Sequence, residues 1–217
     1  MNDNSGIVIR QMTEEDVPAL VRLHSEVFEG YNSTVMGNGY LKSLYRTLAC
    51  DIACISIVAL EGSKLVGWIG GVRDWLSFEK TLTRQSILGA PTILVSILKN
   101  RPKLLARTFS VGWRVFLGFA RVRERQNTPH HRVSGSMAAA LLVIGVAPTH
   151  QNQGLGQFMM QDFHSRLLSE GFATCTLHAL SENKAGNKAF QKVGYSLLGT
   201  DQGVNHYIKY LTDQVGE

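Results

Sequence analysis

A strand–loop–helix–strand unit in the second half of the chain constrains the fold more than any other feature. An apolar strand pattern over 139–146 leads through a loop containing Gly154 and Gly156 into a helical pattern over 155–170. A second strand pattern follows over 173–180. Two strands joined in this way by a helix lie parallel, or nearly so, with a right-handed crossover. The unit predicts a sheet covered by helices, in the α/β or α+β class.

The other patterns add elements on both sides of this unit. In the helix over 155–170 we expect one apolar stripe, formed by Leu155, Phe158, Met159, Phe163 and Leu167, and an end at Gly171. Periodicity and turn residues predict a strand at 7–12, a helix at 14–28 behind the N-cap Thr13, a helix at 40–49, a hairpin of 54–60 with 64–72, a helix at 183–193, and strands at 195–200 and 205–211.

Composition is that of an ordinary globular protein. The 217 residues are 44% hydrophobic, which fits a single domain spanning 1–217. The first residues lack the pattern of a secretory signal, and no apolar run reaches the length of a membrane span, so we expect a cytoplasmic protein. The three cysteines form no CxxC pair, and we expect three buried thiols with no disulfide and no metal.

Positive charge is concentrated in one segment, residues 73–135. It holds 12 of the 22 Lys and Arg residues but only 3 of the 17 Asp and Glu residues, a net charge of 12 minus 3, or +9. The segment resembles an insertion with amphipathic basic helices. Three uses stay open: a subdomain that packs on the body or forms a homodimer, a lid over a substrate, and contact with a membrane surface. Nucleic acid is not expected as the main partner.

The glycine loop predicts an anion site. The first N–H groups of a helix have no partner within the helix, and the helix dipole adds partial positive charge there. Glycines let the backbone come close to a phosphate group, so a diphosphate can be held without a lysine. A Walker loop is excluded because Gln157 and Phe158 follow Gly156, and a dinucleotide fingerprint is excluded because its third glycine is missing.

Two motifs stand out in the second half of the chain. The first is Val146-Ala147-Pro148 followed by Gln151-x-x-Gly154-x-Gly156. The second is Asn183, then an alanine-containing helix that closes on Gly194-Tyr195. Both resemble motifs of the GNAT superfamily of acyl-CoA N-acyltransferases. The resemblance implies a mixed, mostly antiparallel sheet with a splayed pair of strands and flanking helices.

The resemblance also implies acetyl-CoA as co-substrate. Main-chain groups of Ile144 and Val146 would bind its pantetheine arm, and the amides of the loop would bind its diphosphate. An amine would attack the thioester directly, with a main-chain N–H stabilising the charge on oxygen. The implied cofactor-binding residues are Ile144, Gly145, Val146, Gln151, Asn152, Gln153, Gly154, Leu155, Gly156, Asn183 and Phe190.

The sequence departs from the family pattern at both proton-transfer positions. Residues 136–141 hold no carboxylate, so His178 and Glu29 become the candidates for the base that deprotonates the amine. Phe190 stands where the family commonly has a tyrosine acid, which leaves Tyr195 or water to protonate the thiolate. The alternatives are a partly buried, satisfied His178, a solvated Glu29 and a helix-capping Asn183.

The function expected from these motifs is acetylation of a primary amine on a small molecule. A nucleotide-linked amino sugar would suit the basic segment 73–135. Two alternatives remain: an acyl-CoA-binding regulatory protein without turnover, and acetylation of an amine on a protein or an RNA-associated partner.

Overall fold

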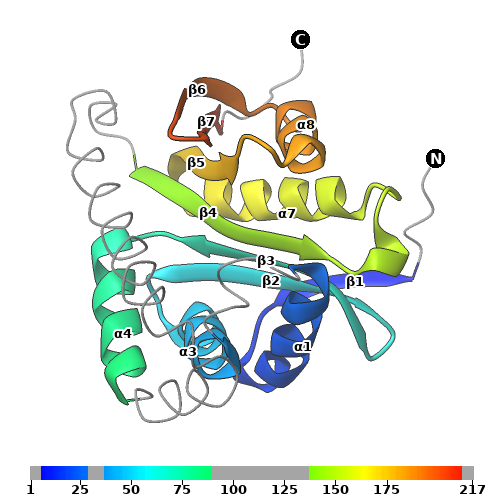
Figure 1. Ribbon diagram of the computed structural model, residues 1–217, viewed down its shortest axis with the longest axis vertical. Helices are drawn as coiled ribbons and strands as arrows, with labels where there is room; N and C mark the ends of the chain where they lie inside the picture. Colours follow the sequence, from blue (N-terminus) through cyan, green and yellow to red (C-terminus); the bar gives the residue numbers. More distant parts are fainter. Residues whose placement is uncertain (1–5, 29–36, 89–136, 212–217) are drawn as a thin grey trace.

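The part of the chain that the structure describes is built around a seven-stranded sheet (Figure 1). The structure, a computed structural model, describes residues 6–28, 37–88 and 137–211. The strand order is β1-β2-β3-β4-β5-β7-β6. The strands are β1 (Ile7–Gln11), β2 (Cys54–Glu61), β3 (Lys64–Val72), β4 (Met137–Val146), β5 (Phe172–Leu180), β6 (Ser196–Asp201) and β7 (Val204–Tyr210).

Strand directions confirm the expected class of sheet. Among the strands that the structure describes, β4 and β5 pair in parallel and the other five neighbouring pairs are antiparallel. The parallel pair follows from the helix that connects these two strands, since a crossover returns the chain in the same direction. The prediction of a mixed, mostly antiparallel sheet is confirmed.

Helices cover both faces of this sheet. They are α1 (Val17–Val27), α3 (Gly37–Cys50), α4 (Trp75–Leu88), α7 (Leu155–Ser169) and α8 (Lys184–Lys192). The predicted helix at 14–28 begins as a short 3-10 turn, Glu14–Asp16, before α1. The Asp16 carboxylate accepts a hydrogen bond from the Thr13 amide at 2.8 Å and binds Arg10 through two 2.7 Å contacts, which fixes the start of this segment.

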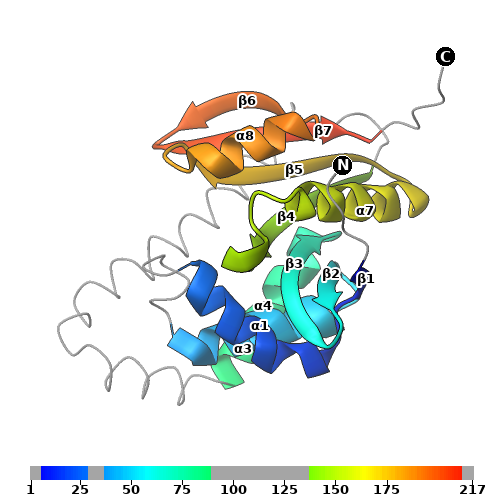
Figure 2. The same cartoon turned by 90° about the vertical axis from the view of Figure 1, so that its right-hand side faces the viewer.

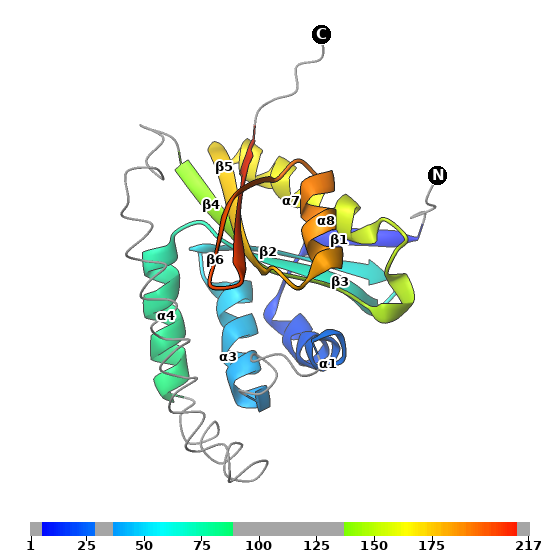
Figure 3. The ribbon, with the colours of Figure 1, turned by 45° about the horizontal axis from the view of Figure 1, so that its top comes forward.

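The glycines of β3 show which helices lie on which face of the sheet, because Cβ atoms added to them would contact different helices. A Cβ atom built on Gly67 or Gly71 would meet Met159 or Phe163 of α7 at 2.8 and 2.4 Å. A Cβ built on Gly70 would instead meet Leu48 of α3 at 2.8 Å. Successive strand residues point to opposite faces, so α7 packs on one face while α3, with α1 and α4 beside it, packs on the other (Figure 3). The glycines allow both layers to come close to β3.

Two expectations about buried residues are wrong, one in α7 and one at the end of α3. Four of the five predicted stripe residues are buried, but Phe158 is 41% exposed, and Met160 and His164 are buried instead. The stripe was misjudged because Phe158 lies at the edge of the buried face in the first turn. The expectation of three buried thiols was also wrong for Cys50, which is exposed as the last residue of α3.

Helix α4 lies in the first part of the basic segment 73–135, which was expected to be a helical insertion, although no bounds were predicted for this helix. It packs beside α3. The rest of that segment, from 89 to 135, lies outside the described residues. In the part of the chain that is described, no helix has the length and apolar character needed to cross a bilayer.

Candidate functional site

The sheet opens between β4 and β5. The two strands pair from Met137 with Phe172 as far as Leu141 with Leu177, and the pairing stops there. On its other edge, β4 stays paired with β3 up to Val146. Residues 142–146 therefore have one main-chain edge that is not paired with β5, and the strands diverge toward the loop before α7 (Figures 1 and 2).

A bulge in β4 lies where the gap begins. Gly70 pairs with Val143 and Gly71 pairs with Leu141, so Leu142 is the extra residue. A bulge increases the local twist and redirects the following residues. It separates the part of β4 that pairs with β5 from the part that borders the gap.

The loop after β4 is held by its own hydrogen bonds. The Ala147 amide donates to the Val66 carbonyl at 2.8 Å, and the Gln151 side chain donates to the Val146 carbonyl at 3.0 Å. The Gln153 side chain donates to the Thr149 carbonyl at 3.0 Å. These contacts preform the loop, and the Gln151 contact occupies one of the Val146 main-chain groups that the family resemblance assigns to pantetheine.

Gly154 starts helix α7 in a conformation that suits glycine. It is the N-cap, with a φ of 81°, which residues with a side chain rarely adopt. Gly156 lies in the first turn, where an added Cβ would come within 3.6 Å of the Val146 side chain, an ordinary contact distance. The helix thus begins beside the end of β4, and its first-turn N–H groups have no partner within the helix. A role for them in binding an anion stays a prediction.

An aromatic cluster packs against β4 on the face of the sheet that α1 and α3 cover. The Trp68 side chain is fully buried, and a Cβ atom on Gly145 would come within 2.2 Å of its ring. His24 and Tyr45 pack around Trp68 with ring centroids 6.1 Å away, and the His24 Nδ1 lies 2.6 Å from the Tyr45 hydroxyl. The sequence did not predict this cluster, because it joins residues of α1, α3 and β3; Gly145, whose missing side chain leaves room for the Trp68 ring, is the position that marks it.

Burial sets the protonation of this cluster. Desolvation lowers the pKa of His24 to about 4, so His24 is neutral near pH 7. Burial also raises the pKa of Tyr45 well above its usual value. His24 is therefore a structural partner of Tyr45 and not a charged group at neutral pH.

His178 is the first residue of β5 after the part of this strand that pairs with β4. It is exposed, and its ring lies 4.6 Å from the His206 ring in an edge-on contact. Its neighbour Leu177 is buried opposite Tyr207, so His178 projects from the other face of the sheet. His178 thus lies where the pairing of β5 with β4 ends, and the expectation that it is half-buried is wrong because it is exposed. Its role as the base stays a prediction.

Tyr195 lies in a buried chain of hydrogen bonds. Its hydroxyl lies 2.8 Å from His164 Nε2 and donates to Cys175 Sγ at 3.2 Å. Since the hydroxyl has one proton, neutral His164 donates to Tyr195. Burial raises the pKa of Tyr195 well above its usual value. A role for Tyr195 as the acid stays a prediction, and these buried partners argue against it.

The remaining predicted residues have mainly structural contacts. Asn183 caps α8, accepting a 3.0 Å hydrogen bond from the Gly186 amide, as the capping alternative predicted. Phe190 is 7% exposed and packs against Tyr195 and Tyr207 with ring centroids 6.2 Å away in both contacts. Glu29, the other candidate base, lies outside the described residues. In the residues that are described, no group of three potential metal ligands occurs.

A model of the acetyltransferase (GNAT) family matches residues 103–195. This range includes the loop, the start of α7 and the capped helix α8. The match confirms the resemblance that the two sequence motifs indicated. No curated protein matches the chain.

Several solved structures share the fold along nearly the whole chain. The PaiA N-acetyltransferase of Thermoplasma acidophilum, in complex with coenzyme A, is 14% identical with a TM-score of 0.54, covering 94% of this chain and 98% of that chain. The ribosomal-protein-S18-alanine N-acetyltransferase of Escherichia coli is 13% identical with a TM-score of 0.57, covering 97% of both. NAA60 of Arabidopsis thaliana, with a bisubstrate analogue, is 9% identical with a TM-score of 0.59, covering 95% and 99%. These likenesses establish the GNAT fold.

Proposed function

We propose that this protein, which has the GNAT acetyltransferase fold, transfers an acetyl group from acetyl-CoA to an amine. The observation that carries the proposal is the gap between β4 and β5, which opens at Leu141 and Leu177 and faces the N-terminus of α7. An unpaired strand edge and a helix N-terminus together fit a long ligand that has amide groups at one end and a diphosphate at the other.

Two parts of the chain would hold acetyl-CoA. The edge of β4 over 142–146 offers main-chain donors and acceptors to the pantetheine amides. The first-turn amides of α7 would bind the diphosphate, with Gly154 permitting the tight entry into the helix. Each amide bonded to a charged oxygen contributes on the order of 1.5–3 kcal/mol. The lack of a lysine in the loop 147–156 is consistent with binding by the main chain alone.

The chain contributes few chemical groups to the reaction. Acetyl-CoA supplies an activated acetyl thioester. A main-chain N–H of β4 would stabilise negative charge on the carbonyl oxygen, and the cleft would hold the amine close to it. His178, exposed at the mouth of the gap, is the group that would accept the amine proton.

Two classes of acceptor follow from different observations. The basic segment 73–135 favours an anionic acceptor such as a nucleotide-linked amino sugar, and this argument rests on charge alone. A protein amine is favoured by the structural match to an enzyme named for acetylating an alanine of ribosomal protein S18. The acceptor screen therefore needs both classes.

Release of free CoA thiol with a panel of amines tests the proposal. Amino sugars linked to nucleoside diphosphates and short peptides with free N-termini form the two arms. With an accepted amine, we expect His178→Gln to lower kcat by about 100-fold or more with little change in the KM for acetyl-CoA. The matched change His206→Gln, on the neighbouring strand, should have a smaller effect.

The same assay separates the enzyme from its main alternative. A protein that binds acetyl-CoA but releases no CoA with either class of amine would be a binding protein without turnover. If both histidine variants retain full activity with a good acceptor, the proton acceptor is another group.

A further inference from the structure

A row of three lysines lies on the exposed side of helix α8. Lys184, Lys188 and Lys192 follow one another at intervals of four residues, so their side chains form one row about 12 Å long. All three are exposed, while Asn187 and Phe190 form the buried side of the helix. Within the part of the chain that is described, none of the three lysines forms an ion pair.

The lysine row is unfavourable for the helix that carries it. Like charges four residues apart on a helix repel each other, and the row contains two such pairs. Lys184 also lies in the first turn, where the helix dipole disfavours positive charge and where α8 has no acidic residue. The stability of α8 therefore gives no reason for this row, and its charge indicates an anionic partner outside the helix.

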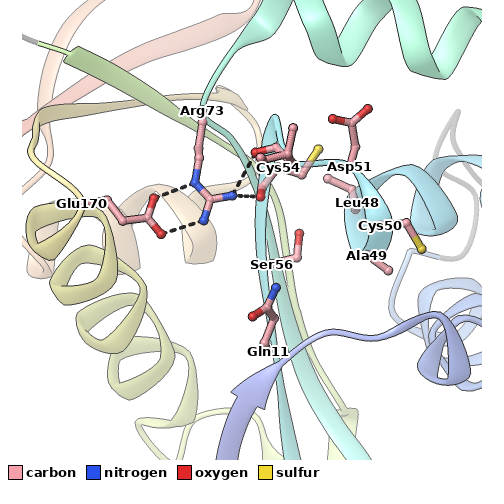
Figure 4. Close-up of a pocket in the computed structure, with 10 residues that line it drawn as sticks. Gln11, Leu48, Ala49, Cys50, Asp51, Cys54, Ser56, Arg73 and Glu170 are labelled. Atoms are coloured by element: carbon pink, nitrogen blue, oxygen red, sulfur yellow. Dashed lines mark hydrogen bonds and ion pairs between the residues drawn. The ribbon is translucent and has the colours of Figure 1, made fainter.

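Several arginines of the described chain are neutralised within the fold instead. Figure 4 shows the clearest case, Arg73, whose Nε and Nη2 donate to the two oxygens of Glu170, both at 2.6 Å. Three more arginines bind carboxylates in the same way, namely Arg10, Arg46 and Arg166. The charge of the lysine row, in contrast, is available to a binding partner.

Strand β6 lies beside the lysine row at the edge of the sheet. Helix α8 packs on β7, where the Tyr207 hydroxyl donates a 3.1 Å hydrogen bond to Asn187 Oδ1, and β7 pairs with β6. Figure 2 shows α8 running along both strands. Among the described strands β6 has β7 as its one neighbour, and its side chains Leu197 and Leu198 are 47% and 56% exposed.

The free edge of β6 favours an extended peptide as the partner. Main-chain groups at the edge of a sheet can pair with an added strand, which a nucleic acid or a lipid cannot supply. The sequence of β6 has neither the lysine nor the proline that commonly prevents such pairing. A bulge at Leu198 limits the regular part of this edge, so the lysine row would supply much of the affinity.

The spacing of the lysines also fits an extended peptide. Neighbouring lysines of the row are about 6 Å apart along the helix axis, because four residues rise 1.5 Å each. Side chains at every second position of a strand point to the same face and are about 6.6–6.8 Å apart. A peptide strand running along β6 would therefore present alternate side chains to α8 at nearly the spacing of the row.

We propose that the α8–β6 surface, formed by Lys184, Lys188, Lys192, Leu197 and Leu198, binds an extended acidic segment of another protein with Asp or Glu at every second position. The lysines would pair with the carboxylates, and the two leucines would contact the apolar parts of the segment. None of these five residues is assigned to acetyl-CoA or to the acetyl transfer, so the surface does not depend on the proposed function.

Fluorescence anisotropy on the full chain tests this surface with a peptide in which glutamate alternates with threonine. Its amino terminus is blocked and its label is at the carboxyl end, so it cannot accept an acetyl group. We expect saturable binding that weakens as salt is added. The triple variant Lys184→Gln/Lys188→Gln/Lys192→Gln should bind the peptide about tenfold more weakly, or worse, without a lower Tm, because it removes only exposed, mutually repelling charges.

A second triple variant is the matched control. Lys42→Gln/Lys64→Gln/Lys80→Gln changes exposed lysines of α3, β3 and α4 and alters the net charge by the same amount. It should bind the peptide like the wild type. A peptide of the same composition with all its glutamates consecutive should bind more weakly than the alternating one, because its carboxylates do not match the row.

Four results would overturn the proposal. The first is the absence of saturable binding to the alternating peptide. The second is equal binding of the alternating and the consecutive peptide, and the third is equal weakening by the two triple variants. The fourth is tighter binding to oligothymidylate or to phosphatidylserine vesicles than to the peptide, lost in the α8 variant, which would assign the surface to a nucleic acid or a membrane.

Discussion

Gly145 lies between the aromatic cluster and the strand edge that borders the gap. The Trp68 ring fills the space where its side chain would be, and His24 and Tyr45 hold that ring in place. A protein interior is packed too closely for such a ring to move freely. This part of β4, and with it the proposed pantetheine site, can keep its position only because Gly145 has no Cβ atom.

Substituting Gly145 with alanine should therefore destabilise the protein. The new Cβ would lie 2.2 Å from the Trp68 ring, and overpacking of this kind costs about 1–3 kcal/mol of unfolding free energy. Gly199→Ala is the control, because nothing lies within 4 Å of a Cβ at that position. Urea unfolding checks both variants; equal stability of the two would show that Trp68 does not constrain β4.

Single residues were the hardest part to predict from the sequence. The capping role of Asn183 could be predicted because it depends on local spacing. The buried chain of His164, Tyr195 and Cys175 could not, since it joins α7, β5 and the segment after α8. Long-range contacts of this kind leave no periodic signal.

At the scale of elements, the two glycines at the start of α7 should respond differently to substitution by alanine. Gly154→Ala should cost about 1–2 kcal/mol, because the residue has a φ of 81°. Gly156→Ala lies within the helix at an ordinary contact distance from Val146, and should be neutral or stabilising by up to about 1 kcal/mol. Thermal unfolding measures the stability of both variants. A Gly156→Ala variant that is less stable than Gly154→Ala would contradict this account of the loop.

The order of elements was predictable where periodicity was strong. The sequence β4, α7, β5, α8 followed from two strand patterns and two helices closed by Gly171 and Gly194. Helix α4 was not given bounds of its own, because its residues were interpreted as part of the basic helical insertion over 73–135. The bulge at Leu142 was missed because it depends on the pairing with β3.

Across the whole molecule, a buried histidine is found on each face of the sheet. Burial lowers the pKa of His24 and of His164 to about 4, with a further contribution from Lys209 for His164. In the unfolded chain both titrate near 6.5. Between these values the unfolded state binds protons that the folded state does not, so the folded state becomes less stable as the pH falls.

Unfolding free energy should be constant above about pH 6.5 and fall toward pH 4 by up to about 1.4 kcal/mol per pH unit for each histidine. The carboxylates of Asp16 and Glu170, whose pKa values are lowered, lose their contribution only below about pH 4.5. Urea unfolding at pH 7.5, 6.5 and 5.5 measures the slope. A flat profile would show that the two histidines bind protons equally in the folded and unfolded protein.

Calorimetric titration with acetyl-CoA tests the central claim most directly, because the gap and the start of α7 were read as one acetyl-CoA site. The wild type is compared with Gly154→Glu/Gly156→Glu, which places negative charge where the diphosphate would bind, and with Gly199→Glu on exposed β6, each checked for folding by circular dichroism. We predict binding with a Kd of about 1–100 μM in the wild type and in Gly199→Glu, and none in the double variant. A folded wild type that does not bind acetyl-CoA, or a double variant that binds it equally well, would contradict the account.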